Sequence, residues 1–136
     1  MKIVLDPGAY MPTRGHSTDA GLDIRTPVKL VVPPKGSVTV DTGVHIELPP
    51  NTAGILEPKS GLNVKKNIIG CGTIDFGYTG SIRVKLYNMG WLPVKFKPGD
   101  KIIQLVINEI RIPELELADE LEDTERGDNG FGTTGR

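Results

Sequence analysis

The chain has 136 residues and a formal net charge of −1, so its charge does not favour a nucleic acid or an anionic membrane as partner. Its one cysteine, Cys71, excludes an internal disulfide and fits a reducing compartment. No apolar run approaches membrane-spanning length, and we expect a single domain in the cytoplasm, or in the nucleus or host-cell interior of a eukaryotic or viral source.

The sequence has 17 glycines and 11 prolines, which lie between short apolar runs. This pattern predicts an all-β fold of many short strands joined by turns. In chain order, the runs that predict strands are residues 2–6, 28–32, 37–41, 44–48, 54–58, 81–87 and 102–107. Alternation predicts that the last of these strands continues to Ile112.

Asp23 sits between Leu22 and Ile24 in a weakly alternating stretch, which predicts a solvent-facing strand carboxylate or a loop anchor. His45 lies on the polar side of its strand beside Glu47, where a histidine is more often a surface residue than a catalytic one. No His/Cys cluster in the sequence has the spacing of a zinc site.

Ser60 begins a short segment that we expect to form a helical turn ending at about Lys66. Capping the first turn is the commoner role for such a serine. An alternative is an anion site made by the free N–H groups and the neighbouring Lys59.

A glycine-dense turn over residues 70–80 separates two runs with strand character. Residues 81–87 alternate strictly, and residues 67–69 with Thr73 and Ile74 offer a β-branched partner strand, so the pattern predicts a β-hairpin. Asp75, at its mouth, is the only carboxylate between residues 57 and 100 and is therefore the candidate general base. Taken alone, the stretch favours an ordinary turn aspartate.

Gln104 is the one polar residue in the apolar run 102–107, which predicts a strand buried on both sides. An unpaired buried amide is costly, so we expect this side chain to be hydrogen-bonded.

The C-terminal region changes in composition: seven of the twelve residues 114–125 are acidic, which predicts a solvated arm. Residues 130–135 read GFGTTG, but no strand precedes and no helix can follow them, so the dinucleotide-binding interpretation fails. Glycine-rich backbone with threonines and flanking arginines suits a flexible phosphate wrapper. A disordered tail is the alternative, against which Phe131 argues.

Five motifs then appear in order along nearly the whole chain: AGLDI at 20–24, PKSGL at 58–62, GTIDFGYTG at 72–80, GDKIIQL at 99–105, and RG followed by GFGTTG within 126–135. With these motifs the chain resembles the homotrimeric dUTP pyrophosphatases, or dUTPases. The resemblance implies a β-clip or jelly-roll-like domain over residues 1–113, with at most one short helix, and a flexible glycine-rich arm over 114–136. It also implies a homotrimer whose sites are shared between subunits.

The implied reaction is hydrolysis of dUTP to dUMP and pyrophosphate with Mg²⁺, which limits uracil in DNA and supplies dUMP for thymidylate synthesis. By resemblance, Asp75 activates the attacking water and Tyr78 packs on deoxyribose. Backbone groups that would read uracil belong to Ile69, Gly72, Thr73, Ile74 and Arg83. Residues that would face the phosphates or close over the nucleotide are Lys59, Ser60, Gly61, Gln104, Arg126, Phe131, Gly132, Thr133 and Thr134. Asp23 would reach Mg²⁺ through water.

Lys59 departs from the arginine of many relatives, and a lysine cannot form a bidentate fork on phosphate. Two other functions compete with the dUTPase interpretation. A dCTP deaminase of the same fold needs a glutamate on the strand 81–87, which has none. A non-enzymatic trimeric jelly-roll module would not need Asp75, Tyr78 and the tail motif together.

Overall fold

Short antiparallel strands form most of the computed structural model, which describes residues 1–128. The strands within these residues are β1 Lys2–Leu5, β2 Leu22–Arg25, β3 Leu30–Val32, β4 Ser37–Asp41, β5 Val44–Glu47, β6 Thr52–Glu57, β7 Ile68–Gly70, β8 Gly72–Ile74, β9 Arg83–Asn88, β10 Val94–Phe96 and β11 Lys101–Glu109. The single helix among them is α1, Ser60–Lys66. The expected all-β domain with one short helix is confirmed.

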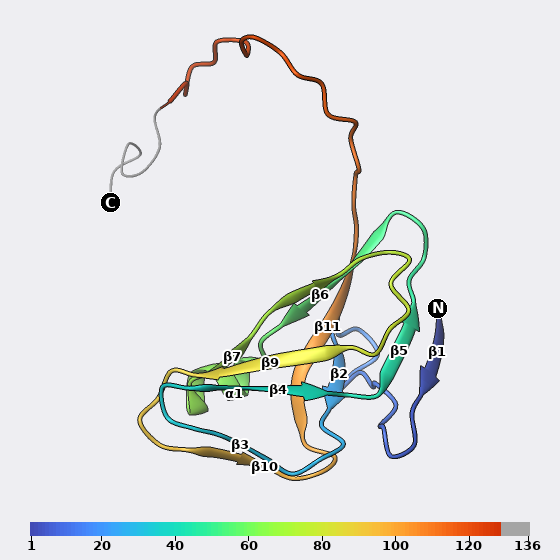
Figure 1. The fold of residues 1–136 in the computed structure, drawn as a ribbon, viewed down its shortest axis with the longest axis vertical. Coiled ribbons are helices and arrows are strands. Elements are labelled where there is room, and N and C mark those ends of the chain that lie inside the picture. Colours follow the sequence, from blue (N-terminus) through green and yellow to red (C-terminus); the bar gives the residue numbers. More distant parts are fainter. Residues whose placement is uncertain (129–136) are drawn as a thin grey trace.

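The larger sheets have the strand orders β2-β11-β6-β8 and β4-β9-β7, and two-stranded sheets pair β1 with β5 and β10 with β3. In Figure 1, β4 and β9 cross in front of β2 and β11. Buried side chains from both larger sheets, such as Ile24 and Leu105 on one and Val84 and Leu86 on the other, belong to one core cluster. The core therefore lies between the two sheets, as in a β-sandwich.

The strand β11 is central, because it pairs with β2 on one side and with β6 on the other. Ile103 and Leu105 are fully buried, which confirms the strand predicted from the run 102–107. The predicted continuation to Ile112 is wrong. Glu109 is the last residue of the ladder, opposite Thr52 at the start of β6. The Ile110 N–H still donates to the Asn51 carbonyl oxygen at 2.9 Å, and beyond it the chain leaves the sheet with Ile112 exposed.

The predicted hairpin is only half right. β7 does pair with β9, but β8, which carries Thr73 and Ile74, pairs with β6 in the other sheet. Ile74 is buried there, so its apolar side chain favours β6 over a place in the hairpin. The chain thus opens between β8 and β9 and leaves β8 as an edge strand of the four-stranded sheet.

The helix α1 ends at Lys66 as expected, but Ser60 is its first residue and not its cap. Lys59 occupies the capping position in an extended conformation, and no side chain caps the first turn. The capping prediction for Ser60 is therefore wrong, because the helix begins one residue earlier than a serine cap at position 60 requires.

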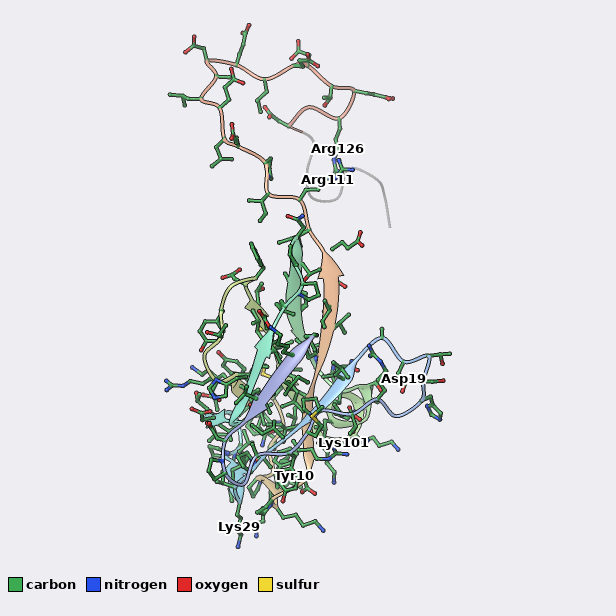
Figure 2. The ribbon with its side chains drawn as sticks, turned by 90° about the vertical axis from the view of Figure 1, so that its right-hand side faces the viewer. Tyr10, Asp19, Lys29, Lys101, Arg111 and Arg126 are labelled. Atoms are coloured by element: carbon green, nitrogen blue, oxygen red, sulfur yellow. The ribbon has the colours of Figure 1, made fainter. Side chains whose placement is uncertain are left out.

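The segment after β11 rises away from the sheets in Figure 1, and Leu115, Leu117 and Leu121 are each at least 90% exposed. Figure 2 shows Arg111 near the base of this segment and Arg126 near its far end. An extended, solvated arm over 114–125 agrees with its acidic composition. The predicted lid residues Phe131, Gly132, Thr133 and Thr134 lie outside the described residues.

The helix in the described part of the chain is too short to cross a membrane.

Candidate active site

A pocket of about 210 Å³ lies where the chain opens between β8 and β9. Its lining residues are Leu56, Gly72, Thr73, Ile74, Asp75, Tyr78, Ile82 and Arg83. We call this set the nucleoside pocket. Its volume is below the ~300–1,000 Å³ of sites for drug-sized ligands, so it suits one base and sugar rather than a whole nucleotide.

Six of the residues predicted to hold the base, the sugar or the attacking water therefore share this pocket. Ile69 is not among its lining residues; it pairs with Tyr87 inside the β7–β9 ladder. Leu56 and Ile82 line the pocket and were missed. Leu56 on β6 pairs with Gly72 on β8. The sequence does not predict this contact, because its pattern assigns Thr73 and Ile74 to a hairpin with residues 81–87.

Asp75 is exposed at the end of β8. Its carbonyl oxygen accepts a hydrogen bond of 3.0 Å from the Tyr78 N–H, which closes a turn over residues 75–78. Within this turn Gly77 has a φ of 90°, a conformation that residues with a side chain rarely adopt. Asp75 is thus a turn residue and a pocket residue at once, so the two interpretations of the sequence do not exclude each other.

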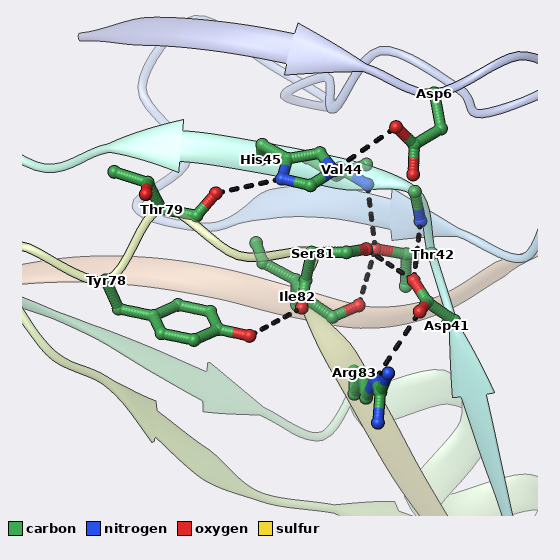
Figure 3. Close-up of polar contacts among 11 residues, drawn as sticks. Asp6, Asp41, Thr42, Val44, His45, Tyr78, Thr79, Ser81, Ile82 and Arg83 are labelled. Carbon is green, nitrogen blue, oxygen red and sulfur yellow. Dashed lines mark hydrogen bonds and ion pairs between the residues drawn. The ribbon is translucent and has the colours of Figure 1, made fainter.

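Tyr78 is placed by the backbone that follows it. Its hydroxyl donates a hydrogen bond of 3.0 Å to the Ser81 carbonyl oxygen (Figure 3). A Cβ atom on Gly80 would lie 2.5 Å from the Tyr78 hydroxyl oxygen, so only glycine leaves room for the ring. The ring is consequently fixed along one wall of the nucleoside pocket.

A second group of site residues surrounds Asp23. Its carboxylate accepts hydrogen bonds from the Nζ of Lys59 on one oxygen and from the Nζ of Lys101, at 2.6 Å, on the other. Asp23 is only 6% exposed, so the prediction of a solvent-facing carboxylate is wrong. The alternation was too short to assign its face, because Asp23 pairs with Gln104 on the central strand β11.

Electrostatics keep Asp23 ionised. Burial acts to raise the pKa of its carboxyl, but hydrogen bonds and charge from Lys101 and Lys59 outweigh burial and hold that pKa below its ordinary value. The negative charge in turn holds two cations beside the N-terminus of α1.

Gln104 satisfies its amide as expected, by donating through Nε2 to the Pro58 carbonyl oxygen at 3.3 Å. A Cβ atom on Gly21 would lie 2.5 Å from the Oε1 atom of Gln104, so the backbone at Gly21 lies close against the Gln104 side chain. Ser60 and Gly61 are exposed next to Lys59 at the start of α1. We call Lys59, Ser60, Gly61 and Gln104, with Asp23 and Lys101, the phosphate wall.

Asp75 lies apart from the phosphate wall, although the pocket residue Leu56 directly precedes Glu57 on β6. Ile74, next to Asp75, pairs with Gly54, whereas Gln104 pairs with Glu57. Three residues along β6 span ~10 Å, and the two strand spacings between β8 and β11 add roughly 10 Å across the sheet. One chain therefore does not bring Asp75 next to its own phosphate wall.

No group of three or more potential His, Cys, Asp or Glu metal ligands occurs in residues 1–128. Both oxygens of Asp23 are taken by lysines, so this carboxylate does not fit direct coordination of Mg²⁺.

Comparisons with known proteins agree with this geometry. The dUTPase family model matches residues 8–135. A deoxyuridine 5'-triphosphate nucleotidohydrolase of Gloeothece citriformis is 45% identical over 134 residues, covering 96% of this chain and 92% of that protein. Among solved structures, a variant dUTPase of Staphylococcus bacteriophage 80alpha with dUpNHpp has a TM-score of 0.89 at 29% identity and covers 99% of this chain and 98% of its own.

A variant dUTPase from phage phi11 of S. aureus, described with a structural Mg(II) ion, has a TM-score of 0.82 at 28% identity and covers 90% of this chain and 98% of its own. The family model spans residues 8–135 and the relatives match over nearly the whole chain, so this chain belongs to the dUTPase family.

Proposed function

We propose that this chain hydrolyses dUTP to dUMP and pyrophosphate by letting Asp75 activate the attacking water. The carboxylate accepts a proton as the water oxygen bonds to the α-phosphorus, and the bond from that phosphorus to the bridging oxygen breaks to release pyrophosphate. The observation that carries the proposal is the nucleoside pocket, in which Asp75, Tyr78 and the free edge of β8 meet.

Uracil is recognised by main-chain groups of Gly72, Thr73 and Ile74, with Arg83 on the facing side. The edge of uracil presents a donor between two acceptors, and an unpaired strand edge offers complementary N–H and C=O groups. Cytosine presents a different order of donors and acceptors, so a site built this way rejects dCTP. Tyr78 packs on deoxyribose and leaves no room for a 2′-hydroxyl.

The phosphates lie against a phosphate wall. Ser60, the Gly61 backbone and Gln104 supply hydrogen-bond donors, and Lys59 supplies positive charge although Asp23 holds its amine. Arg126, Gly132, Thr133 and Thr134 complete the enclosure from the tail, with Phe131 stacked over uracil. These roles follow the family motifs that the residues match.

Mg²⁺ enters this proposal as an ion carried by the substrate's own phosphate oxygens and by water, its usual ligands in nucleotide sites. When bound, it would neutralise phosphate charge. Asp23 would contact it only through water, because lysines occupy both carboxylate oxygens. No step above depends on the ion.

The separation between Asp75 and the phosphate wall supports a homotrimer in which each site takes parts from different subunits. The arm over 114–125 has twelve residues and, when extended, could reach ~40 Å, enough to cross to a neighbour. A closed threefold assembly then gives three equal sites.

Measuring pyrophosphate release from dUTP, dCTP, dTTP and UTP tests the proposal. We expect hydrolysis of dUTP with strong preference over the other three. Ammonia release from dCTP would instead identify a deaminase, and the absence of turnover with all four nucleotides would favour a non-enzymatic module.

A further inference from the structure

Residues 75–82 form a loop between β8 and β9, which we call the substrate loop because it carries Asp75 and Tyr78. Figure 3 shows that β4, β5 and the turn between them fasten one side of it. At its base, the Thr42 hydroxyl donates to the Ile82 carbonyl oxygen at 2.8 Å, and the Ile82 N–H donates to the Val44 carbonyl oxygen at 2.8 Å. The Ser81 hydroxyl also donates to Asp41.

His45 on β5 reaches further along the loop. Its Nδ1 donates to the carbonyl oxygen of Thr79 at 2.8 Å, and its Nε2 lies 3.3 Å from Oδ1 of Asp6 (Figure 3). The sequence suggested an ordinary surface histidine, yet its side chain is only 27% exposed and both ring nitrogens are engaged. His45 therefore joins the substrate loop to the segment after β1.

The two partners of His45 favour its protonated form. A carbonyl oxygen only accepts, so Nδ1 must carry a proton, and a proton on Nε2 lets the ring donate to the Asp6 carboxylate as well. The Thr79 carbonyl, the Asp6 carboxylate and the charge of Asp41 together raise the pKa of His45 above its ordinary value. The other nearby charges are already paired, Lys2 with Glu47 and Arg83 with Asp41.

The bond to Thr79 lies next to the residue that touches the sugar. Tyr78 directly precedes Thr79, and its ring is held over Gly80 by the hydroxyl bond to Ser81. The backbone conformation of residues 79–81 therefore determines the position of the Tyr78 ring. His45 fixes one end of this short path, and Asp41 fixes the other through Ser81.

We propose that His45 is a positioning residue that holds Tyr78 against the sugar, and that it thereby sets the preference of the enzyme for deoxyribose over ribose. This inference rests on the proposed role of Tyr78. It concerns kcat/KM for dUTP relative to UTP far more than kcat for dUTP, because His45 does not line the nucleoside pocket.

The test compares wild type with two variants at position 45 and one at position 6. For each protein, kcat/KM is measured for dUTP and for UTP at several pH values. His45→Ala removes both contacts, and we expect the dUTP preference to fall about five- to tenfold, as for the loss of an ordinary hydrogen bond. His45→Asn can still donate to Thr79 and should recover most of the preference. Asp6→Asn keeps the ring in place and should lower the pH at which the preference weakens.

The pH profile gives a readout that a structural role would not move. His45 has a raised pKa, so its second contact is present below the ordinary value of 6.5 and is lost as pH rises through the higher folded value. The dUTP preference of wild type should weaken over that range, whereas that of His45→Asn should not change. His16→Asn is the matched control, since the only other histidine lies in the loop before β2.

The result that overturns the inference is an unchanged dUTP preference in both position-45 variants, including the case in which only their melting temperatures fall. If His45→Ala fails to fold, the pH profiles of His45→Asn and Asp6→Asn decide. Tyr78→Ala separates this inference from its premise. If Tyr78→Ala keeps the wild-type preference for dUTP, the proposed role of Tyr78 is wrong and the inference about His45 is wrong with it. If Tyr78→Ala loses the preference while both position-45 variants keep it, only the role of His45 is refuted.

Discussion

The nucleoside pocket and the phosphate wall are built in different ways. The pocket is made from one strand edge and one loop, so a single chain carries together the residues that we propose face the base and the sugar. The phosphate wall consists of side chains gathered around the buried carboxylate of Asp23, on β11 and at the start of α1. In the proposed function, this difference makes base and sugar selection local to one chain, whereas cleavage takes parts from several.

Replacing Asp75 with asparagine should have the largest effect. The change keeps size and removes the base, so we expect turnover to fall by about 10²- to 10⁴-fold while binding of a non-hydrolysable dUTP analogue is retained. Pyrophosphate release and calorimetric binding measure the two quantities. Asp119→Asn on the exposed arm is the matched control, and near-normal turnover in Asp75→Asn would remove Asp75 from the mechanism.

Truncation after Glu125 should rank next. It removes Arg126 and the predicted lid, so we expect turnover to fall roughly 10²- to 10³-fold, the range for losing donors around a developing charge. Circular dichroism and light scattering should still report a folded trimer, because the core ends with β11. Removal of Arg136 alone serves as the control; full activity after the longer truncation would show that the tail has no part in catalysis.

Asp23→Asn should have a smaller effect that falls on the phosphate wall. Two lysine amines lose their common partner, and because Lys59 and Lys101 remain partly exposed we expect a loss of about 1–3 kcal/mol in the free energy of unfolding. The KM for dUTP should rise while discrimination among bases stays unchanged. Urea titrations and steady-state kinetics measure these effects, with Glu47→Gln, which breaks the exposed Lys2–Glu47 pair, as control.

The effect of Asp23→Asn on stability should depend on pH in one direction. The pKa of Asp23 is lowered in the folded protein, so its contribution is present above the ordinary value of 3.8 and is lost as pH falls through the folded value. The gap in unfolding free energy between wild type and Asp23→Asn should therefore close in acid. A gap that stays constant down to pH 2 would show that charge is not its cause.

Tyr78→Phe should have the smallest effect. It keeps the ring and removes the hydroxyl bond to Ser81, so we expect the preference for dUTP over UTP to fall only about two- to tenfold. Kinetics with the two nucleotides provide the measurement. A collapse of the preference in this variant would mean that the hydroxyl, rather than the ring, excludes ribose.

Most strands could be predicted from the sequence because alternation and turn residues are local signals. The short helix α1 and the start of the central strand β11 were predicted close to their bounds, whereas the end of β11 was placed three residues too far. The partner of β8 was not, since Thr73 and Ile74 suit either sheet and the choice depends on burying Ile74 against distant residues. Pairing between distant segments leaves little trace in a single sequence.

The same distinction holds within the site. The contiguous turn motif placed Asp75 and Tyr78 together, and the resemblance to the dUTPases gave their expected roles. The burial of Asp23 between Lys59 and Lys101 was missed, since three separate segments meet there. His45 was set aside for the same reason, because both of its partners, Asp6 and Thr79, lie more than thirty residues away in the chain.

The sharing of each site between subunits is tested most directly by mixing two inactive proteins, Asp75→Asn and the truncation after Glu125, and then unfolding and reassembling them together. A site is whole when the chain giving Asp75 is the truncated one and the chain giving the lid is the substituted one. Random assembly makes this true for roughly a quarter of sites, so activity should return to about a quarter of wild type if subunits contribute independently. Activity that stays near zero would show that base and lid belong to the same chain and would contradict the shared site.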